Sequence, residues 1–208
     1  MNTLVRRLCL AALLAACRRD PPAAGDVPPC HRRHGDASTA AAAPLPGASL
    51  FHLEGAWSDQ AGAPFRFASL RGSPAVILMF YGTCQAVCPI LIGDTLRLEA
   101  ALAPAARART RFVLVTFDPG TDTPERLRAL AAERGMDLSR WSLVRGADGD
   151  VRALATVLGV QYSRIGPRDF THSNVITVVD PQGVVARQVE GLRQPVDAAA
   201  RAIESLSP

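Results

Sequence analysis

The sequence predicts an α/β fold in which a central mixed sheet is flanked by helices. Two continuous apolar runs, residues 75–81 and 111–117, have the pattern of strands buried on both faces, and a helical pattern follows each of them. Near the C-terminus, two strand-like segments around a tight turn precede a final helical pattern over residues 196–206. Strand, helix, strand, helix, then a hairpin and a helix is the thioredoxin-like order of elements. A further β-hairpin is expected in front of it.

Length and composition indicate one globular domain with additional segments. The chain has 208 residues, of which 48% are hydrophobic, enough for a sizeable core. Aromatic residues make up only 5%, so the core is expected to consist mainly of Ala, Val and Leu. The formal net charge is +4, every basic residue is Arg, and the charges are spread along the chain without a dense basic block. Nucleic acid is therefore not an expected partner.

The N-terminus has the features of an export signal. Arg6 and Arg7 form a short positive region, and the apolar run over residues 8–16 is too short to span a bilayer comfortably. The run ends in Leu-Ala-Ala followed by Cys17, which resembles the lipobox of bacterial lipoproteins. Residues 1–16 are therefore interpreted as a signal peptide and Cys17 as the lipidated first residue. An ordinary signal peptide, or an uncleaved anchor, stays open, and all three interpretations place the domain outside the cytoplasm.

Residues 17–48 are interpreted as a flexible tether between the membrane and a folded domain at residues 49–208. The segment is rich in Pro, Ala, Gly and Arg and shows no periodicity. It contains Cys30, His31 and His34, which are close enough in sequence to bind a metal transiently. A linker with chance ligands is the simpler interpretation and is favoured.

The first half of the domain is expected to begin with short strands. Residues 49–54 alternate weakly and suggest a first strand, residues 57–62 are turn-forming, and residues 64–67 follow. Together they suggest the N-terminal β-hairpin. After the buried strand at 75–81, a helix is expected over residues 89–102. Pro89 suits the first turn of that helix, where its missing N–H is not needed.

The second half alternates helices and strands. Thr123 is a candidate N-cap with Pro124 at the first helical position, and this helix is expected to end near Arg134 because Gly135 follows. The remaining expected elements are a strand at 141–144, a helix at 148–158 closed by Gly159, two strands at 174–179 and 184–189, and the closing helix.

Cys84 and Cys88 lie four residues apart, between the first buried strand and the helix that follows it. Residues i and i+4 share one face of a helix, so both sulfur atoms can point to one side. The N–H groups and dipole of a helix N-terminus lower the pKa of nearby thiols. Two thiolates with one imidazole form a soft site that suits Cu(I), whereas a structural zinc site needs four ligands. Alternatively, the pair can form a disulfide outside the cytoplasm.

A histidine is the natural third ligand of such a site. From residue 49 onward the chain contains only His52 and His172. His172 is expected in a loop, residues 169–174, and in a thioredoxin-like sheet this loop lies beside the helix that follows the cysteines. From its position alone, His172 is equally consistent with a role as a metal ligand and with a role as a surface or structural residue.

Three segments together resemble the Sco/SenC family. Residues 81–89 (Tyr-Gly-Thr-Cys-Gln-Ala-Val-Cys-Pro) are similar to its Cys-x-x-x-Cys-Pro site, and residues 116–124 (Thr-Phe-Asp-Pro-Gly-Thr-Asp-Thr-Pro) to its Asp-Pro…Asp-Thr-Pro segment. Residues 169–173 (Asp-Phe-Thr-His-Ser), followed by a strand and Asp-Pro-Gln-Gly at 180–183, are similar to its histidine loop and hairpin. The resemblance covers about residues 50–206.

The resemblance implies a thioredoxin-like, membrane-tethered copper metallochaperone on the periplasmic side. By match with the family motifs, Cys84, Cys88 and His172 are the implied ligands of copper, as Cu(I) or Cu(II). The implied partners are the CuA-bearing subunit of cytochrome c oxidase, whose CuA site such a protein helps to assemble, and other copper chaperones.

Two residues depart from the family pattern. Many members carry Pro and Asp after the first cysteine, where this chain has Gln85 and Ala86. Without the acidic neighbour, the site is less negative and the thiolates are expected to form more readily. The departure leaves the implied ligands intact and leaves partner recognition open. Asp118 and Asp122 are expected to serve capping and turn formation, with shaping of the loop beside the site as the alternative.

A second class of function uses the same cysteines without copper. A thiol–disulfide oxidoreductase would reduce cysteines of a CuA subunit or of another exported protein. Cys84 would be the attacking thiolate and Cys88 the resolving thiol, so the two would cycle through a disulfide. His172 would then be dispensable or would only tune the pKa. A peroxidase-like protein needs an Arg and a Thr around its reactive cysteine, and Thr83 alone gives that interpretation little support.

Overall fold

The computed structural model describes residues 44–206, and the statements on structure below concern this part of the chain. The features predicted before it lie outside the described residues: the signal peptide at 1–16, the lipidation site Cys17, and the tether as far as residue 43 with Cys30, His31 and His34. Among residues 44–206, no helix combines the length and the apolar character needed to cross a membrane.

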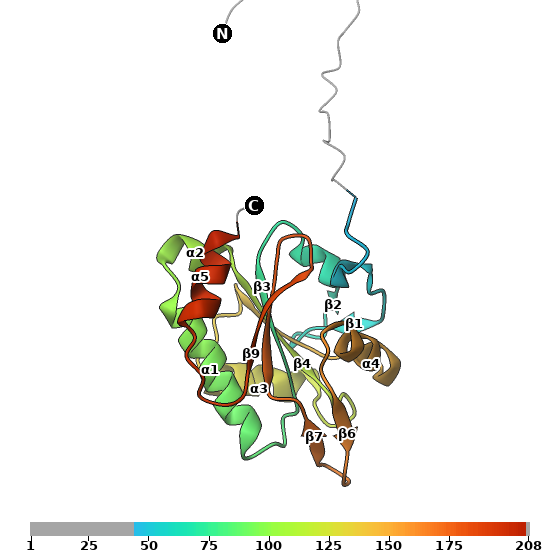
Figure 1. Ribbon diagram of the computed structural model, residues 1–208. Coiled ribbons are helices and arrows are strands. Elements are labelled where there is room, and N and C mark those ends of the chain that lie inside the picture. The colour runs from blue at the N-terminus through green and yellow to red at the C-terminus, as the bar shows by residue number, and fades with distance from the viewer. Residues whose placement is uncertain (1–43, 207–208) are drawn as a thin grey trace, which may run out of the picture. The chain divides into compact units, whose positions relative to one another are not determined.

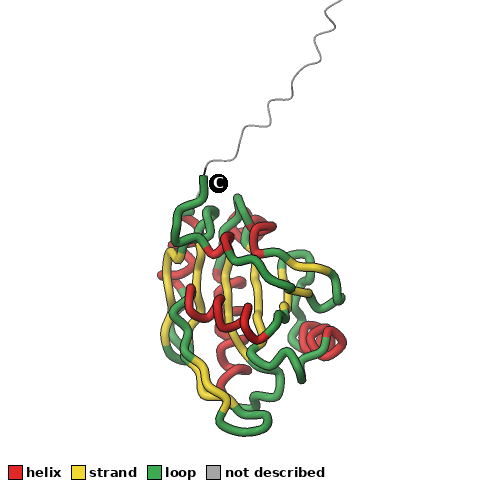
Figure 2. Tube along the Cα trace, turned by 90° about the vertical axis from the view of Figure 1, so that its right-hand side faces the viewer, coloured by secondary structure: helices red, strands yellow, loops and turns green. Residues whose placement is uncertain are grey.

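A five-stranded mixed sheet forms the centre of the fold, and its strands lie side by side in Figure 2. The strand order is β5 (Trp141–Val144), β4 (Arg111–Thr116), β3 (Ala75–Phe80), β8 (Val175–Val179) and β9 (Val185–Glu190). β3 pairs in parallel with β4, and β4 with β5, whereas β8 is antiparallel to both β3 and β9. All six residues of β3 are buried, as expected for a central strand covered on both faces.

Helices pack against this sheet in the predicted arrangement. α1 (Val87–Ala101) and α5 (Asp197–Ser205) contact each other and the strands β3, β8 and β9, on the left in Figure 1. α4 (Asp148–Val157) appears on the right of the sheet, and α3 (Pro124–Glu133) contacts β5. A short helix that was not predicted, α2 (Pro104–Arg109), connects α1 to β4. The strand order around β3, with α1 and α5 on one side, is thioredoxin-like.

Several predicted boundaries are confirmed by local interactions. The Thr123 hydroxyl accepts a hydrogen bond from Arg126 N–H and caps α3, as the sequence predicts. Gly135 follows α3 and Gly159 follows α4, with φ of +64° and +66°, a conformation that glycine adopts without strain.

α1 begins two residues earlier than expected, so that Pro89 lies within its first turn and Cys88 belongs to the helix.

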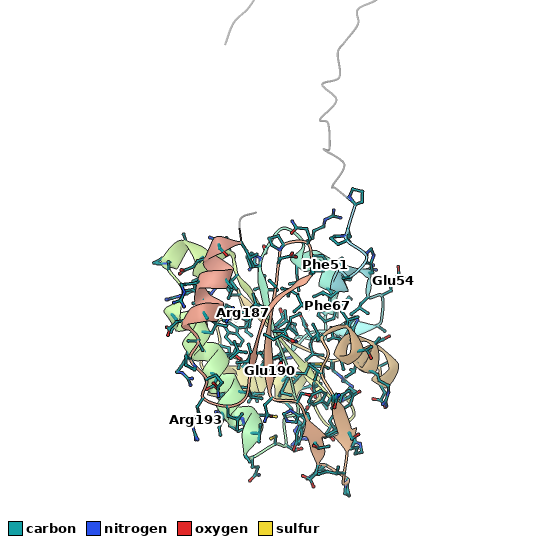
Figure 3. All side chains as sticks on the ribbon, viewed as in Figure 1. Phe51, Glu54, Phe67, Arg187, Glu190 and Arg193 are labelled. Carbon is teal, nitrogen blue, oxygen red and sulfur yellow. The ribbon has the colours of Figure 1, made fainter. Side chains whose placement is uncertain are left out.

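The prediction of a strand over residues 49–54 is wrong. Leu50–His52 form a turn of 3₁₀-helix, because the Ser49 hydroxyl accepts a hydrogen bond from Phe51 N–H and donates one to the Gln182 carbonyl. Leu50 and Phe51 are consecutive and both buried, whereas successive residues of a strand point to opposite faces. Figure 3 labels Phe51 near Phe67, which begins a second 3₁₀ turn, Phe67–Leu70.

An N-terminal hairpin is present, but its first strand lies within the segment predicted as the turn, and a second hairpin replaces the loop predicted around His172. β1 (Trp57–Ser58) pairs antiparallel with β2 (Pro64–Phe65). β6 (Tyr162–Arg164) pairs antiparallel with β7 (Phe170–His172), and this pair extends from the sheet near the start of α1 in Figure 1. His172 is therefore the last residue of a strand, which fixes the direction of its side chain more firmly than a loop would.

Candidate metal centre

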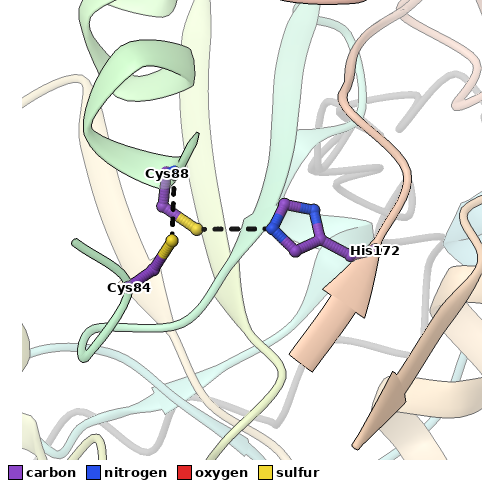
Figure 4. A group of neighbouring side chains, drawn as sticks. All are labelled: Cys84, Cys88 and His172. Carbon is purple, nitrogen blue, oxygen red and sulfur yellow. Dashed lines mark hydrogen bonds between the residues drawn. The ribbon is translucent and has the colours of Figure 1, made fainter. Parts of the chain in front are cut away.

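The cysteine loop, residues 81–86, connects β3 to the N-terminus of α1. Cys84 N–H donates a hydrogen bond to the Tyr81 carbonyl at 3.3 Å, which closes the turn. Cys88 N–H, in the first turn of α1, donates to Cys84 Sγ at 3.3 Å, so this sulfur takes the place of a capping oxygen. The two cysteines are not bridged; Cys88 is buried and Cys84 is half-buried. Figure 4 shows their sulfur atoms next to each other.

His172 approaches the cysteines from β7. Its Nε2 lies 3.6 Å from Cys88 Sγ, and its Nδ1 lies 3.0 Å from the Ser173 carbonyl oxygen (Figure 4). When Nδ1 carries the proton and donates it to that carbonyl, Nε2 keeps a lone pair that faces the sulfurs. The rings of Tyr81 and Phe117 pack against the imidazole, with centroid distances of 6.0 and 5.3 Å. The ring is thus held in one orientation.

The three side chains have the geometry and chemistry of a small metal site. The ligand atoms of Cys84, Cys88 and His172 all lie within 4.8 Å of one another. Metal–sulfur and metal–nitrogen bonds are about 2.0–2.3 Å long, so a single ion can reach all three with small movements. Two sulfurs and one imidazole nitrogen are soft ligands, and residues 44–206 contain no other cluster of this kind.

The two thiols differ in pKa because their surroundings differ. Burial raises the pKa of the Cys84 thiol, but hydrogen bonds from the N–H groups of Cys88 and Ala86 outweigh it and lower the pKa. Burial is the main cause that raises the pKa of Cys88, and the neighbouring Cys84 sulfur raises it further. Burial, together with Cys84, also raises the pKa of Tyr81 to about 12. Cys84 is therefore the more readily ionised thiol of the pair.

This difference predicts selective alkylation of the reduced, metal-free protein. At neutral pH we expect iodoacetamide to modify Cys84 well before Cys88, because the thiolate is the nucleophile and Cys84 is both more ionised and more exposed. Peptide mass spectrometry of a time course gives the two rates, with the urea-unfolded protein as the control in which both cysteines react alike. Faster modification of Cys88 would contradict the assignment.

Asp122 fixes the cysteine loop to the neighbouring strand. Its buried carboxylate accepts hydrogen bonds from Gly82 N–H, at 2.9 Å, and from the Thr116 hydroxyl at the end of β4. Gly82 is required at this contact, because a Cβ atom there would overlap the Asp122 carboxylate. Asp122 thus shapes the loop beside the site, the alternative that the sequence left open for it.

Asp118 makes a similar connection to the hairpin that carries His172. Its buried Oδ1 accepts a hydrogen bond from Arg164 Nη2 on β6 at 2.9 Å. The Arg164 guanidinium also lies over the Phe170 ring, 4.4 Å from its centroid. The loop between β4 and α3 therefore holds both parts of the site, through Asp122 on the cysteine side and Asp118 on the histidine side.

An open groove of about 930 Å³ gives solvent access to the cluster. The cysteine loop forms one wall and the β6–β7 hairpin forms the other, and the Thr83 hydroxyl donates a hydrogen bond to the Arg168 carbonyl between them, at 3.2 Å. Gln85 and Ala86, two of the three residues between the cysteines, are exposed and line this groove. Any partner that reaches Cys84 meets these neutral side chains.

The sequence identified the three clustered residues but not the aromatic side chains that pack around them. Cys84, Cys88 and His172 are brought together, whereas His52 is exposed and its Nε2 contacts the Pro46 carbonyl. The aromatic packing by Tyr81, Phe117, Tyr162 and Phe170 was missed, since aromatic residues at these positions match the ordinary pattern of buried strands.

Comparison with known proteins assigns the chain to a family. The sequence model of the SCO1/SenC family matches residues 50–207, most of the described region. A protein of Stutzerimonas stutzeri, provisionally named a copper-binding protein, is 26% identical over 130 residues. This match covers 60% of the chain and 62% of the relative, so the chain spans less than two thirds of that relative's length.

Solved structures share the fold. A SCO1/SenC family lipoprotein from Bacillus anthracis str. Ames is 25% identical, with a TM-score of 0.67 and coverage of 74% of this chain and 94% of that one. ScoI of Bradyrhizobium japonicum with copper bound is 21% identical (TM-score 0.58; coverage 72% and 95%). BsSco, a member of the Sco family of cytochrome c oxidase assembly proteins with an identified disulfide switch, is 20% identical (TM-score 0.66; coverage 75% and 93%). These likenesses confirm the thioredoxin-like α/β fold.

Proposed function

The chain belongs to the SCO1/SenC family, and from this premise we propose that it is an exported, membrane-tethered copper metallochaperone. Cys84, Cys88 and His172 bind the copper ion, as Cu(I) or Cu(II), and the protein passes it on during assembly of the CuA site of cytochrome c oxidase. The CuA-bearing subunit and other copper chaperones are its partners. The copper bound in ScoI of Bradyrhizobium japonicum supports the binding of copper. The family of BsSco, the Sco family of cytochrome c oxidase assembly proteins, supports the role in oxidase assembly.

The observation that carries the proposal is the approach of His172 to the cysteine pair. A protein that used only a dithiol would not need an imidazole whose Nε2 lies 3.6 Å from Cys88 Sγ with Nδ1 engaged by a backbone carbonyl. Two sulfurs and one nitrogen satisfy Cu(I), which accepts few and soft ligands, and fall one ligand short of a structural zinc site.

The different environments of the two sulfurs suit transfer of the ion. Cys84 lies at the groove and is more exposed than Cys88, so it is the ligand that an incoming donor can displace or share. Cys88 is buried, and copper must displace the proton of its thiol when it binds. Transfer by ligand exchange changes no oxidation state: copper–ligand bonds to this protein break as bonds to the partner's donors form.

The proposed location of the protein rests on its N-terminal sequence. Cleavage after residue 16 and lipidation of Cys17 would tether the domain at 49–208 to the membrane through residues 17–48, on the periplasmic side. The SCO1/SenC family lipoprotein of Bacillus anthracis supports this arrangement. Mass spectrometry of the mature protein, extracted from membranes of a bacterial host, would detect the lipid on Cys17.

Metal titration of the reduced, exported domain tests the copper proposal. We expect about one Cu(I) per protein, because the three donors surround one position. The double variant Cys84→Ser/Cys88→Ser serves as the matched control and should take up no tightly bound copper. Failure of the reduced wild-type domain to bind Cu(I) in competition with a chromophoric chelator would refute the proposal.

A second candidate function, thiol–disulfide exchange, is favoured by the lowered pKa of Cys84 and by the disulfide switch of BsSco. In this reaction the Cys84 thiolate attacks a partner disulfide and releases one partner thiolate. Cys88 then attacks the mixed disulfide, which releases the second partner thiol and leaves a Cys84–Cys88 disulfide. The partner is reduced by two electrons and this chain is oxidised by two. The partner would be a CuA subunit or another exported protein.

A further inference from the structure

The groove beside Cys84 has a cationic lining. Its charged residues are Arg126 on α3, and Arg168 and Asp169 at the turn of the β6–β7 hairpin. The residues that directly follow Cys84 add no charge to it, because Gln85 and Ala86 are neutral and exposed. The N-terminus of α1 lies at the same groove through Ala86 and Val87, and the helix dipole adds partial positive charge there. Two guanidinium groups and one carboxylate therefore line the opening to the metal centre.

Both arginines are available to a partner. Arg126 and Arg168 are exposed, and neither takes part in any ion pair formed by the described residues. Arg126 Nη1 donates only to the Thr121 carbonyl, at 3.2 Å. By contrast, Arg164 on the same hairpin already pairs with the buried Asp118 carboxylate. An arginine without an ionic partner keeps its capacity for bidentate hydrogen bonds to carboxylates.

The β6–β7 hairpin holds Arg168 and Ile165 in a fixed position beside Cys84. Thr83 Oγ1 donates to the Arg168 carbonyl, which joins the turn of the hairpin to the residue before Cys84. Ile165, at the same turn, also lines the groove and is 68% exposed, the most exposed large apolar side chain among residues 44–206. A cationic surface with one projecting apolar side chain, rigidly attached beside the reactive sulfur, is suited to recognise a polypeptide.

We propose that this groove docks an acidic segment of the partner protein, in which carboxylates flank the cysteine thiols that receive the copper ion. Arg126 and Arg168 bind the carboxylates, and Ile165 contacts an apolar residue of the same segment. The proposal rests on the proposed function for the identity of the cargo, but docking itself needs no copper. Gln85 and Ala86, which add no negative charge to the groove, allow an acidic segment to approach Cys84.

Two short synthetic peptides serve as probes. Each carries a Cys-x-x-x-Cys core, flanked by aspartates in one peptide and by asparagines in the other. We expect the copper-loaded protein to transfer Cu(I) to the aspartate peptide about tenfold faster at low ionic strength. Arg126→Gln and Arg168→Gln should each lower the rate of transfer to the aspartate peptide by about 3–10-fold. The preference for the aspartate peptide over the asparagine peptide should vanish at about 0.5 M salt, where exposed charges are screened.

Arg187→Gln is the matched control, since it removes one exposed arginine from β9, away from the β6–β7 hairpin (Figure 3). Its transfer rates should equal those of the wild-type protein. Equal rates for the two peptides, or an equal loss in the control, would overturn the proposal.

A copper-free measurement separates this proposal from the proposed function. Peptides with serine in place of cysteine are titrated into the metal-free protein, and backbone NMR shifts of the hairpin are followed. Binding of the aspartate version, weakened by Arg126→Gln and Arg168→Gln, supports docking even if the protein binds no copper. Copper transfer without any binding preference between these peptides would refute docking and leave the metallochaperone function standing.

Discussion

His172→Ala is expected to lower the affinity of the reduced protein for Cu(I) by at least about 100-fold, since even residues that only orient a metal ligand contribute about 10–100-fold. Among residues 44–206, the substitution removes the one histidine nitrogen that lies within reach of the cysteine sulfurs, and it leaves both sulfurs in place. Two thiolates still hold Cu(I), but more weakly. Competition with a chromophoric Cu(I) chelator measures the affinity, and the nitrogen contribution to the EPR spectrum of a Cu(II)-loaded sample should disappear.

The same variant distinguishes the two candidate functions. His52→Ala, which changes an exposed histidine bonded to the Pro46 carbonyl, is the control and should bind copper like the wild-type protein. If the main role is thiol–disulfide exchange, His172→Ala should retain oxidase assembly in cells and the rate of reduction of a disulfide substrate. Unchanged copper affinity in His172→Ala would refute the assignment of His172 as a ligand, whatever the activity in cells.

Asp122→Ala is expected to destabilise the fold by about 2–4 kcal/mol, the usual cost when a buried polar network loses its central acceptor. The substitution leaves Gly82 N–H and the Thr116 hydroxyl without their buried partner. Because Gly82 lies next to the turn that carries Cys84, the cysteine loop should also become less ordered. Urea unfolding followed by circular dichroism measures the loss of stability, and Cu(I) competition measures the effect on the site.

Two further variants make this result specific. Asp122→Asn keeps one acceptor oxygen and should lose less stability than Asp122→Ala. Asp197→Ala, in the exposed first turn of α5, removes a carboxylate without a buried network and should cost only about 0.3–1 kcal/mol. If Asp122→Ala proved no more destabilising than Asp197→Ala, Asp122 would not hold the cysteine loop in the way that the structure indicates.

The loop between β4 and α3 explains how two distant parts of the chain form one site. Asp122 binds the backbone of the cysteine loop, and Asp118 binds Arg164 of the hairpin that carries His172. The Thr116 hydroxyl joins them, because it donates to Asp122 and accepts a hydrogen bond from Asp118 N–H. The separation between the sulfurs and the imidazole is therefore set by a third segment that contributes no ligand.

Local patterns predicted most of the architecture. The apolar runs gave β3 and β4, since a strand covered on both faces has no polar side. Thr123 marked the start of α3, and Gly135 its end, because capping depends on residues adjacent in sequence. The spacing of Cys84 and Cys88 predicted two sulfurs on one side of a helix start for the same reason. Each of these features is decided within a few residues of chain.

Other features are decided by contacts between residues far apart in sequence. Ser49 forms a turn and not a strand because its hydroxyl reaches the Gln182 carbonyl, 133 residues away. The β6–β7 hairpin has no clear pattern of its own, and the stacking of Tyr162 on Phe117 at 4.5 Å helps to hold it against the sheet. Periodicity along the chain carries no information about such partners.

The cysteine pair and the thioredoxin-like order could be inferred from the sequence alone, because both depend on residue types and spacing along the chain. By its position alone, His172 was equally suited to a ligand and to a surface residue, and only the family resemblance implied it as the third ligand. Only the folded chain brings its Nε2 to within 3.6 Å of Cys88, across 84 residues, and sets its orientation through Ser173, Tyr81 and Phe117. A metal site needs donors placed to within fractions of an ångström, and packing of the whole domain supplies that precision.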